Sequence, residues 1–567
     1  IPDLKLKVSL GADVMYHKTN RYTPSNIYQS GGVASAYVGV NKSINWLNEN
    51  TLTWNKTFAE EHDLSLLGGF TMQKNNAEYV MGSSSNFVND VMLYNNLGAG
   101  SVYNKPESNA TQWSLMSYLA RINYTLKHKY LFSVNARVDG SSRFGTNNKY
   151  GFFPSASAGW RISEEAFMEP VKEVISNLKL RASYGFTGNT EIGVYESLAT
   201  LGTSNWILGN QLVSGFFPNK IPNPDLKWER TGQFDIGLDL GLFNNRLRIT
   251  TDYYKKKTTD LLYSVAVPAT SGYQTMLKNI GSIENQGYEL SIESDNLTGA
   301  FSWTTAFNIA FNRNKVLELG GEEYKEMAEG DGHLKTGSVR RLIVGEPIGV
   351  FYGYRFDGIF QNEEECKQQT SSASPIGVGL RRYKDLNGDG KVDAANDREI
   401  LGDANPKFFG GLTNTFAYKG FELNVFLQYS YGNKILNYNA MELENPTGGQ
   451  NAYADMVNRW TPENPSNIYP KATTNRALLV SDRFIEDGSY LKLKTLSLSY
   501  SFPKINLKHI QGLRLYVTGQ NLLTWTKYRG YDPEVSYRGA STLEAGEDFG
   551  GYPQSRTFMF GIKLDIK

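Results

Sequence analysis

The sequence predicts an all-β chain that folds as a transmembrane antiparallel β-barrel. Long segments alternate apolar and polar residues with a period of two, as strands with two different faces do. No run of about 18 apolar residues is present, so a transmembrane helix is not expected. Long and short connections between the segments alternate nearly throughout, which is typical of outer-membrane barrels and not of soluble β-sandwiches.

The clearest alternation is found in residues 228–258. Apolar residues share one face of the first strand, namely Phe234, Ile236, Leu238 and Leu240. The polar face, which we expect to line a lumen, carries Gln233, Asp235 and Asp239 and, after an Asn-rich turn, Arg248 and Asp252. These two strands are roughly twice the usual length of about 5–6 residues. They match the ~9–11 tilted residues that cross a bilayer.

About sixteen strands are predicted in chain order. Before the 228–258 hairpin they cover residues 4–16, 44–58, 64–73, 114–126, 130–140, 150–162 and 178–186. After it they cover 283–297, 301–314, 408–418, 421–432, 490–502, 513–523 and 555–567. A short helical connection is expected around 164–175. The longest connections are expected at 75–111, 188–227, 314–406 and 434–488.

Composition narrows the class of partner. The 58 Lys and Arg residues nearly balance the 57 Asp and Glu residues, which argues against nucleic acid as a partner. The 35 Tyr and 9 Trp residues suit aromatic girdles at two membrane interfaces, or equally a sugar-binding surface. Cys366 is the only cysteine, so no internal disulfide can form.

The sharpest local motif lies at residues 385–397, within the longest connection. Oxygen-bearing residues at alternate positions around a Gly turn follow the pattern of an EF-hand loop. The expected ligands are Asp385, Asn387, Asp389, the carbonyl of Lys391, Asp393 and Asp397, because Asn396 stands where the last acid usually falls. We expect a structural Ca²⁺ or Mg²⁺ here. The alternative is a solvated Asx turn that binds no ion.

No catalytic constellation is apparent, so the chain is not expected to be an enzyme. The five histidines are dispersed, and none pairs with another at metal-ligand spacing. Aromatic residues in the long connections are candidate substrate contacts, because flat rings stack on sugars or on peptide side chains. The candidates are Trp206, Tyr438 and Trp460, together with Phe216, Phe217 and Tyr453.

Several longer stretches carry a family resemblance. ARVDGSSRFGTNNKYGFFPSASAGWRISEEAFM, NPDLKWERTGQFDIGLDL, YKDLNGDGKVDAANDREILGDANPKFFGG and LYVTGQNLLTWTKYRGYDPE resemble segments of the SusC-like branch of TonB-dependent outer-membrane transporters. They keep the family's order from about residue 110 to the end of the chain.

The resemblance implies a 22-stranded barrel with an N-terminal plug, of which residues 1–567 are the C-terminal part. The plug and about six strands are then expected before Ile1, since 22 minus sixteen leaves six. It also implies energy from TonB–ExbB–ExbD, a SusD-like lipoprotein lid, and import of oligosaccharides or oligopeptides across the outer membrane of a Gram-negative bacterium. Dimers of barrel–lid pairs are a further family expectation. Such barrels usually end in an aromatic residue, whereas this chain ends in Lys567.

Two other functions stay open from the residues alone. A passive porin without a plug would have the same strands and the same polar lumen. A surface carbohydrate-binding β-protein would use the aromatic side chains without any transport.

Overall fold

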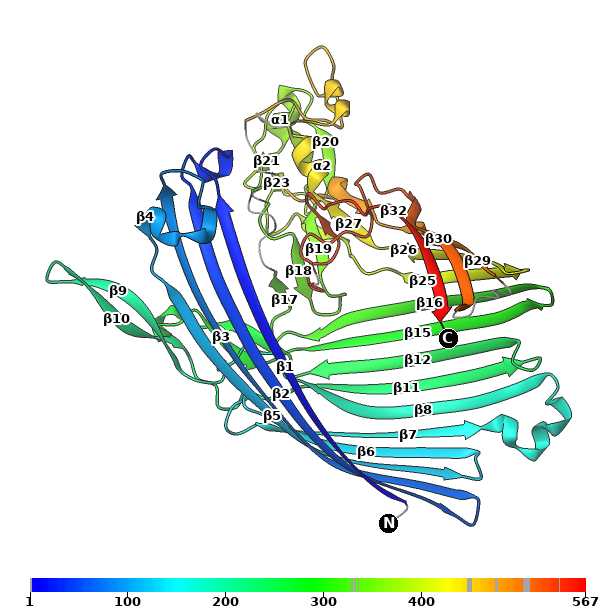
Figure 1. The fold of residues 1–567 in the computed structure, drawn as a ribbon. Coiled ribbons are helices and arrows are strands. Elements are labelled where there is room, and N and C mark those ends of the chain that lie inside the picture. Colours follow the sequence, from blue (N-terminus) through cyan, green and yellow to red (C-terminus); the bar gives the residue numbers. More distant parts are fainter. Residues whose placement is uncertain are drawn as a thin grey trace. The chain divides into compact units, whose positions relative to one another are not determined.

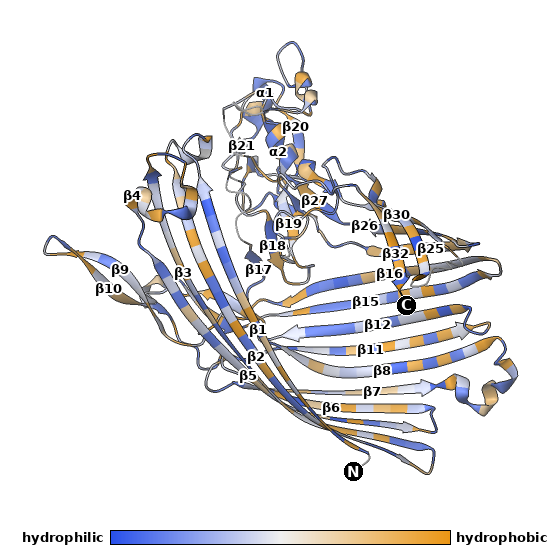
Figure 2. Cartoon of the chain, viewed as in Figure 1, coloured by the Kyte–Doolittle hydropathy of each residue, from blue (hydrophilic) through white to orange (hydrophobic). Residues whose placement is uncertain are grey.

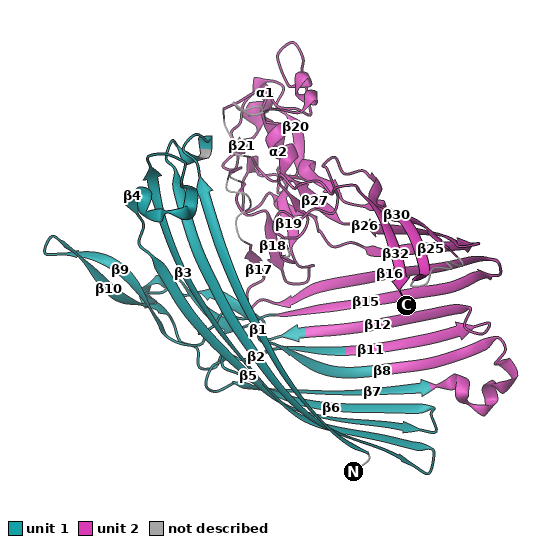
Figure 3. Ribbon diagram, in the orientation of Figure 1, with its two compact units in different colours: residues 1–160, 182–233, 258–281 teal, residues 161–181, 234–257, 282–567 magenta. Residues whose placement is uncertain are grey.

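A computed structural model describes residues 3–327, 330, 333–334, 336–445, 451–474, 478–502, 510–539 and 541–566 (Figure 1). The described residues include no helix that is long and apolar enough to cross a membrane. They form two compact units (Figure 3). Unit 1 comprises residues 1–160, 182–233 and 258–281, and unit 2 comprises 161–181, 234–257 and 282–567.

The strands of unit 1 pair in chain order, each antiparallel to the next. They are β1 (Leu4–Thr23), β2 (Ser35–Phe58), β3 (His62–Phe87), β5 (Glu107–Leu126), β6 (Tyr130–Ser141) and β7 (Tyr150–Arg161). The short strand β4 (Gly100–Tyr103) adds to the end of β3. Sequential antiparallel pairing through short turns is the up-and-down topology of membrane barrels.

Unit 2 repeats this antiparallel order. Its strands are β15 (Ser282–Thr298), β16 (Phe301–Glu318), β25 (Phe408–Tyr418), β26 (Phe421–Tyr431), β29 (Tyr490–Ser501), β30 (Ile510–Thr526) and β32 (Thr557–Ile566). The last residue of β7, Arg161, falls in unit 2, and three more strands are divided between the units: β8 (Ile175–Asn189), β11 (Glu229–Leu242) and β12 (Leu247–Thr259). The described sheet has 17 strands, and without the four-residue β4 the count is 17 − 1 = 16, as the sequence predicts.

Hydrophobic and hydrophilic residues alternate along the strands (Figure 2), so each strand has one apolar and one polar face. On β6, Phe132 and Val134 are 47% and 53% exposed, and Val134 lies opposite Ile122 of β5, which is 49% exposed. Between them Ser133 points to the other face, opposite Asn123. Large apolar side chains left exposed along whole strands are expected where the surrounding solvent is lipid.

The predicted ends of the first strands are wrong. β1 continues to Thr23 instead of ending at 16, and β2 begins at Ser35 instead of 44. Much of the expected connection 75–111 is strand, because β3 continues to Phe87 and β5 begins at Glu107. Much of these extensions is polar, and apolar residues alternate only briefly there, as in Ala36, Val38 and Val40. Backbone pairing, such as Lys42 opposite Glu78, continues without an apolar face.

Connection lengths alternate as predicted, with one departure. Residues 59–61, 127–129, 299–300 and 419–420 form tight turns, whereas 190–228, 319–407 and 432–489 are long. The connection 162–174 is the departure: it holds the 3₁₀ helices Ile162–Glu164 and Ala166–Val171 and is longer than 142–149 on the other side. Of the short connection expected after residue 502, residues 503–509 lie outside the described part, as does Lys567.

The long connections of unit 2 carry secondary structure of their own. They hold α1 (Glu363–Gln368) and α2 (Tyr438–Leu443), and one four-stranded sheet of β17 (Tyr324–Glu326), β18 (Arg340–Ile343), β19 (Val350–Tyr354) and β24 (Arg398–Gly402). Smaller sheets join β20 (Phe356–Ile359) to β22 (Arg381–Tyr383), β21 (Thr370–Ser371) to β23 (Lys391–Val392), and β27 (Lys434–Asn437) to β28 (Ile485–Asp487) and β31 (Glu547–Asp548). We call these packed connections the loop cluster. Its hydrophobic core includes Phe351, Leu436 and Phe484, all 0% exposed.

Two hairpins extend the connections of unit 1. The first pairs β9 (Thr200–Leu208) with β10 (Gln211–Lys220), and the second pairs β13 (Leu262–Ala266) with β14 (Thr275–Asn279). Gly209 and Asn210, the turn of the first hairpin, both have φ near +60°, the conformation that suits Gly and Asn in two-residue turns.

Candidate functional site

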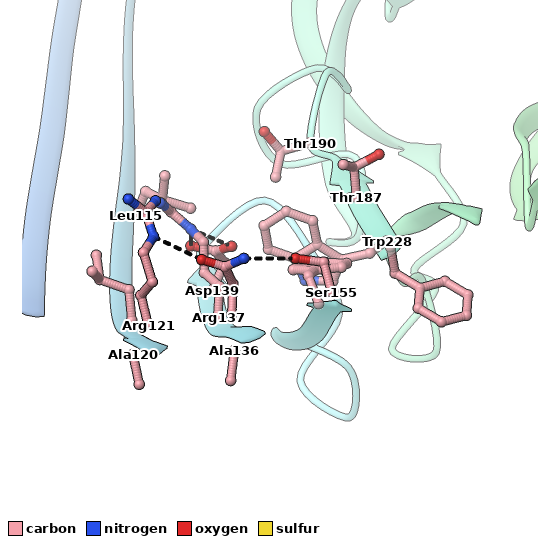
Figure 4. Close-up of a pocket in the computed structure, with 15 residues that line it drawn as sticks. Leu115, Ala120, Arg121, Ala136, Arg137, Asp139, Ser155, Thr187, Thr190 and Trp228 are labelled. Carbon is pink, nitrogen blue, oxygen red and sulfur yellow. Dashed lines mark hydrogen bonds and ion pairs between the residues drawn. The ribbon is translucent and has the colours of Figure 1, made fainter. Parts of the chain in front are cut away.

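A row of hydrogen-bonded polar side chains crosses β5, β6 and β7 on the face opposite the exposed apolar residues (Figure 4). Arg121, Asn135 and Ser155 are direct cross-strand neighbours. Arg121 Nε donates to Asn135 Oδ1 at 2.7 Å, and Asn135 Nδ2 donates to Ser155 Oγ at 3.2 Å. The row fixes these long side chains in place and leaves other donors and acceptors on the same face for a ligand.

A second polar row lies beside the first. Arg137 Nε donates to both carboxylate oxygens of Asp139, at 2.7 and 2.8 Å, and Arg137 Nη2 donates to Ser117 Oγ at 3.0 Å. Residues two apart on a strand share a face, so the Arg137–Asp139 pair is local to β6. Opposite charges thus alternate with amides and hydroxyls on this face.

Both rows border a cavity of about 710 Å³ within unit 1. Its apolar wall contains Phe153 and Trp228, whose rings meet edge to face with centroids 5.3 Å apart. Gly188 makes this packing possible, because a Cβ there would lie 2.2 Å from the Phe153 ring. The cavity therefore combines an aromatic wall with charged and amide groups, which suits recognition of a hydrophilic molecule.

The polar face of the 228–258 hairpin forms ion pairs within unit 2. Arg181 bridges Asp239 at 2.9 Å and Asp252 at 2.9 Å. Arg248 Nε contacts Glu293 at 3.0 Å. The predicted grouping of Asp239 with Asp252 is thus confirmed, whereas their partner Arg181 is not foreseen. Gln233 and Asp235 lie half-buried on β11.

Buried ion pairs hold the loop cluster together. Arg340 Nε donates to Glu547 Oε1 at 2.8 Å, with the two side chains 2% and 1% exposed, and Arg340 also donates to the carbonyls of Gly349 and Ala545. A guanidinium with several acceptors can be buried because its donors are satisfied. This pair ties the connection after β16 to the connection after β30.

A second group in unit 2 is centred on Lys492, which is 1% exposed. Its Nζ lies 2.6 Å from Asp532 and 2.6 Å from Glu534, and Lys494 Nζ lies 2.9 Å from Glu534. Burial acts to raise the pKa of Glu534, but the hydrogen bonds from the two lysines outweigh it and lower the pKa from 4.5 to about 2. Glu534 is therefore a carboxylate at neutral pH.

The 385–397 motif forms a turn whose carboxylates accept backbone hydrogen bonds. Asp385 accepts from the N–H groups of Gly388 and Gly390, both at 2.7 Å. Asp397 is 0% exposed and accepts from Leu386 and Asp393, at 2.8 and 2.7 Å.

Two further contacts involve the predicted ligands of this turn. Lys391 Nζ lies 3.1 Å from Asp393 Oδ2. Asn387 and Asp389 hydrogen-bond each other at 3.0 Å. Among the described residues, no group of three or more His, Cys, Asp or Glu side chains is placed to hold a metal ion.

The aromatic candidates have very different surroundings. Tyr438 is 0% exposed in the core of the loop cluster, so its assignment as a substrate contact is corrected: no ring face is open to a ligand. Trp460 is half-buried, and its Nε1 donates to Gln361 Oε1 at 3.1 Å. Trp206 on β9 is 57% exposed and is the open ring among the three.

Comparison with known proteins identifies the family. The family model described as "TonB dependent receptor-like, beta-barrel" matches residues 2–522. The chain belongs to the TonB-dependent receptor family. It is therefore an outer-membrane β-barrel protein, and the relatives that it matches are receptors and transporters instead of enzymes.

Individual relatives agree with this assignment. TonB-dependent receptor P3 of Formosa agariphila is 39% identical over 572 residues, which cover 100% of this chain and 56% of the relative. TonB-dependent receptor SusC of Bacteroides thetaiotaomicron is 32% identical over 476 residues, covering 81% of this chain and 44% of SusC. The chain thus spans about half the length of these curated relatives.

A solved structure supports the fold of the receptor. The structure of the RagAB peptide transporter superposes with a TM-score of 0.83 at 27% identity, covering 100% of this chain and 60% of that one. The SusC-like resemblance seen in the sequence is thereby confirmed.

Sequence reasoning missed the polar rows and the buried ion pairs. The rows could have been found, because LARINYTL and SVNARVDG alternate as the 228–258 hairpin does and place Arg121, Asn135 and Arg137 at matching positions. The Arg340–Glu547 pair could not, because its partners are 207 residues apart in connections without any periodic pattern.

Proposed function

We propose that the chain is the barrel portion of a transporter that imports oligosaccharides or oligopeptides across the outer membrane, with energy supplied through TonB–ExbB–ExbD. One observation carries the proposal: hydrogen-bonded polar rows, exemplified by Arg121, Asn135 and Ser155, lie opposite an exposed apolar face in a receptor of this family. A polar face of this kind offers hydrogen bonds to a hydrophilic substrate as it passes.

The substrate class has support from two directions. The cavity beside the rows pairs aromatic rings with charged and amide groups, and both sugars and peptides use such surfaces. Among the relatives, RagAB is described as a peptide transporter, and SusC is the namesake of the branch that the sequence resembles. The oligosaccharide is the first choice because most members of that branch are thought to serve glycan uptake.

The proposed protein partners come from the resemblance to the SusC-like branch. We propose a SusD-like surface lipoprotein as a lid over the long connections, and a dimer of such barrel–lid pairs. The long connections then face the outside of the cell and the tight turns face the periplasm. The packed loop cluster supports this orientation, because a stable surface is what a lid protein needs in order to dock.

Energy-dependent uptake separates import from passive diffusion. In cells that express the full-length receptor, uptake of a labelled oligosaccharide or oligopeptide at micromolar concentration should be lost when either the receptor or TonB is removed. Uptake that needs the receptor but continues without TonB would assign the barrel as a passive porin.

Partitioning tests the remaining alternative. The full-length receptor should require detergent for extraction and should bring a lipoprotein with it. Extraction in aqueous buffer alone, with glycan binding retained, would assign a surface carbohydrate-binding protein instead.

We further propose that Ca²⁺ or Mg²⁺ binds the 385–397 turn, as the spacing of its oxygens predicts. Added cation should then slow hydrogen exchange of the amides at 386–397, and Asp385→Asn should abolish the effect. An equal exchange rate with cation and with chelator would show that the turn is held by its own hydrogen bonds, such as those from Gly388 and Gly390 to Asp385.

A further inference from the structure

Arg381 is a buried cation with an unusual shortage of partners. It lies on β22, opposite Ile359 of β20, and only 8% of it is exposed. Its Nη2 donates to the backbone carbonyl of Glu444 at 3.2 Å, whereas its Nε is buried and has no hydrogen-bond partner. Within the described part of the chain, no carboxylate bonds to this guanidinium.

The carboxylate nearest to Arg381 is already occupied by other arginines. The Glu444 side chain, 1% exposed, accepts from Arg483 at 2.9 and 2.6 Å and from Arg529 at 2.9 Å. Arg529 also bonds Glu486, at 2.7 Å. Three guanidiniums therefore lie around two carboxylates, and Arg381, which is more buried than Arg529, bonds neither carboxylate. A buried charge without a counter-ion is costly, so the group favours an added anion.

A small cavity in unit 2 adjoins Arg381. Its volume is about 50 Å³, and the buried residues Tyr383, Asn445 and Leu478 also line it. One water needs roughly 10–15 Å³ by the same measure, so the space holds about three to five water-sized groups. That space accommodates a carboxylate group or a small oxyanion, and a single chloride fits with room to spare. Leu380, Pro470 and Leu478 give the cavity apolar walls beside the guanidinium, which weakens the screening of its charge.

We propose that this cavity is an anion site in which Arg381 binds a carboxylate or another anion of that size. The planar guanidinium donates from Nε and Nη along one edge, which matches two oxygens of a carboxylate. The anion comes either from the medium or from the end of a bound ligand that carries a carboxylate. The site stands whichever molecule the receptor imports.

The test is ³⁵Cl NMR line broadening with the full-length receptor in a non-ionic detergent. Chloride that exchanges with a protein site broadens in proportion to the sites occupied, and acetate should remove that broadening by competition. In Arg381→Gln the acetate-sensitive broadening should be lost. The matched control is Arg382→Gln, which removes the neighbouring arginine, half-buried and ion-paired to Asp357 at 2.9 Å; it should broaden chloride as the unaltered receptor does.

Arg381→Lys keeps the test decisive if Arg381→Gln fails to fold. Lysine retains the charge but not the Nε–H donor, so the acetate-sensitive broadening should fall several-fold in a receptor that keeps its folded gel mobility. Equal acetate-sensitive broadening in the unaltered receptor and in the Arg381 variants would overturn the proposal, as would broadening that acetate does not displace.

A second arm identifies the source of the anion. An acetylated penta-alanine with a free C-terminal carboxylate is compared with acetate and with its own C-terminal amide. If the peptide acid displaces chloride at a tenfold lower concentration than acetate does, a carboxylate supplied by a ligand is supported. If it displaces chloride no better than acetate does, a free anion is supported. If the peptide amide displaces chloride as well as the peptide acid does, the carboxylate chemistry is overturned.

Discussion

At the scale of single residues, Arg340 is the side chain whose loss should matter most to the loop cluster. Arg340→Met would leave the buried Glu547 with the longer 3.4 Å contact to Arg538 in place of its 2.8 Å partner. Removing one member of a buried pair typically costs about 3–5 kcal/mol. We expect faster hydrogen exchange of the amides of β18, β19 and β31 in this variant, measured on the detergent-solubilised receptor by mass spectrometry.

Arg382→Met is the control for this prediction. It removes an arginine of the same connection, but one that is half-buried and paired to the more exposed Asp357. An exposed pair contributes about 0–1 kcal/mol, so exchange in β18, β19 and β31 should stay unchanged. If the two variants exchange alike, the Arg340–Glu547 pair does not hold the connections together.

The lowered pKa of Glu534 predicts how the stability of the receptor depends on pH. Its pKa is lowered from 4.5 to about 2 in the folded receptor, so the stability that it contributes is fully present above pH 4.5 and is lost as the pH falls toward 2. Thermal unfolding of the unaltered receptor and of Glu534→Gln should therefore differ most near neutral pH, and the difference should shrink below about pH 4.5. A difference that is constant from pH 7 to pH 3 would contradict the role of this carboxylate.

The sequence predicts which residues line the polar face better than it predicts which aromatic side chains are buried. The prediction that Asp239 and Asp252 share a face is confirmed, because strand periodicity alone decides which face a residue occupies. The prediction for Tyr438 is wrong, since its burial depends on Phe351 and Phe549, which come from other connections. No local pattern reports on packing between segments so distant in the chain.

At the scale of elements, the exposed apolar face of β6 makes a clear prediction. Val134→Arg would place a charge among exposed apolar side chains, at a cost of roughly 2–4 kcal/mol if the position lies near the middle of the bilayer. The heat-modifiable, folded band on a gel should weaken. Ser157→Arg puts the same residue on the polar face of β7 and should fold normally; equal loss of both bands would contradict the assignment of faces.

Apolar periodicity locates the strands but not all of their ends. All sixteen long strands could be located, because each has a stretch in which apolar residues alternate. The ends of β1, β2 and β3 could not, because much of their extensions is polar and resembles loops in composition. Backbone pairing such as Lys42 with Glu78 continues there without a sustained apolar pattern.

At the scale of the whole molecule, the alternation of connection lengths predicts an orientation in the membrane. An epitope inserted between Gly209 and Asn210, at the tip of the β9–β10 hairpin, should be stained by antibody on intact cells. An epitope inserted after the exposed Glu173, in the connection before β8, should be stained only after permeabilisation. The two sites follow opposite ends of β8, so the reverse result would invert the orientation.

The long connections are where the whole molecule departs most from what the sequence could predict. Their lengths could be read from the spacing of the strands, and lengths alone suggest open loops. The connections instead share a core and buried ion pairs, and these contacts join residues such as Arg340 and Glu547 that lie 207 positions apart. Such contacts arise only once the strands have brought the ends of the connections together.

The length of β2 and β3 has a consequence for how receptors of this kind diversify. These strands have 24 and 26 residues, and their polar extensions are held by main-chain groups that every amino acid except proline provides. Exposed side chains in the extensions can therefore be exchanged with little effect on the fold, whereas Ala36 and Ser84 are buried there. Binding surfaces at the strand ends can therefore change in evolution while the β-sheet that supports them keeps its fold.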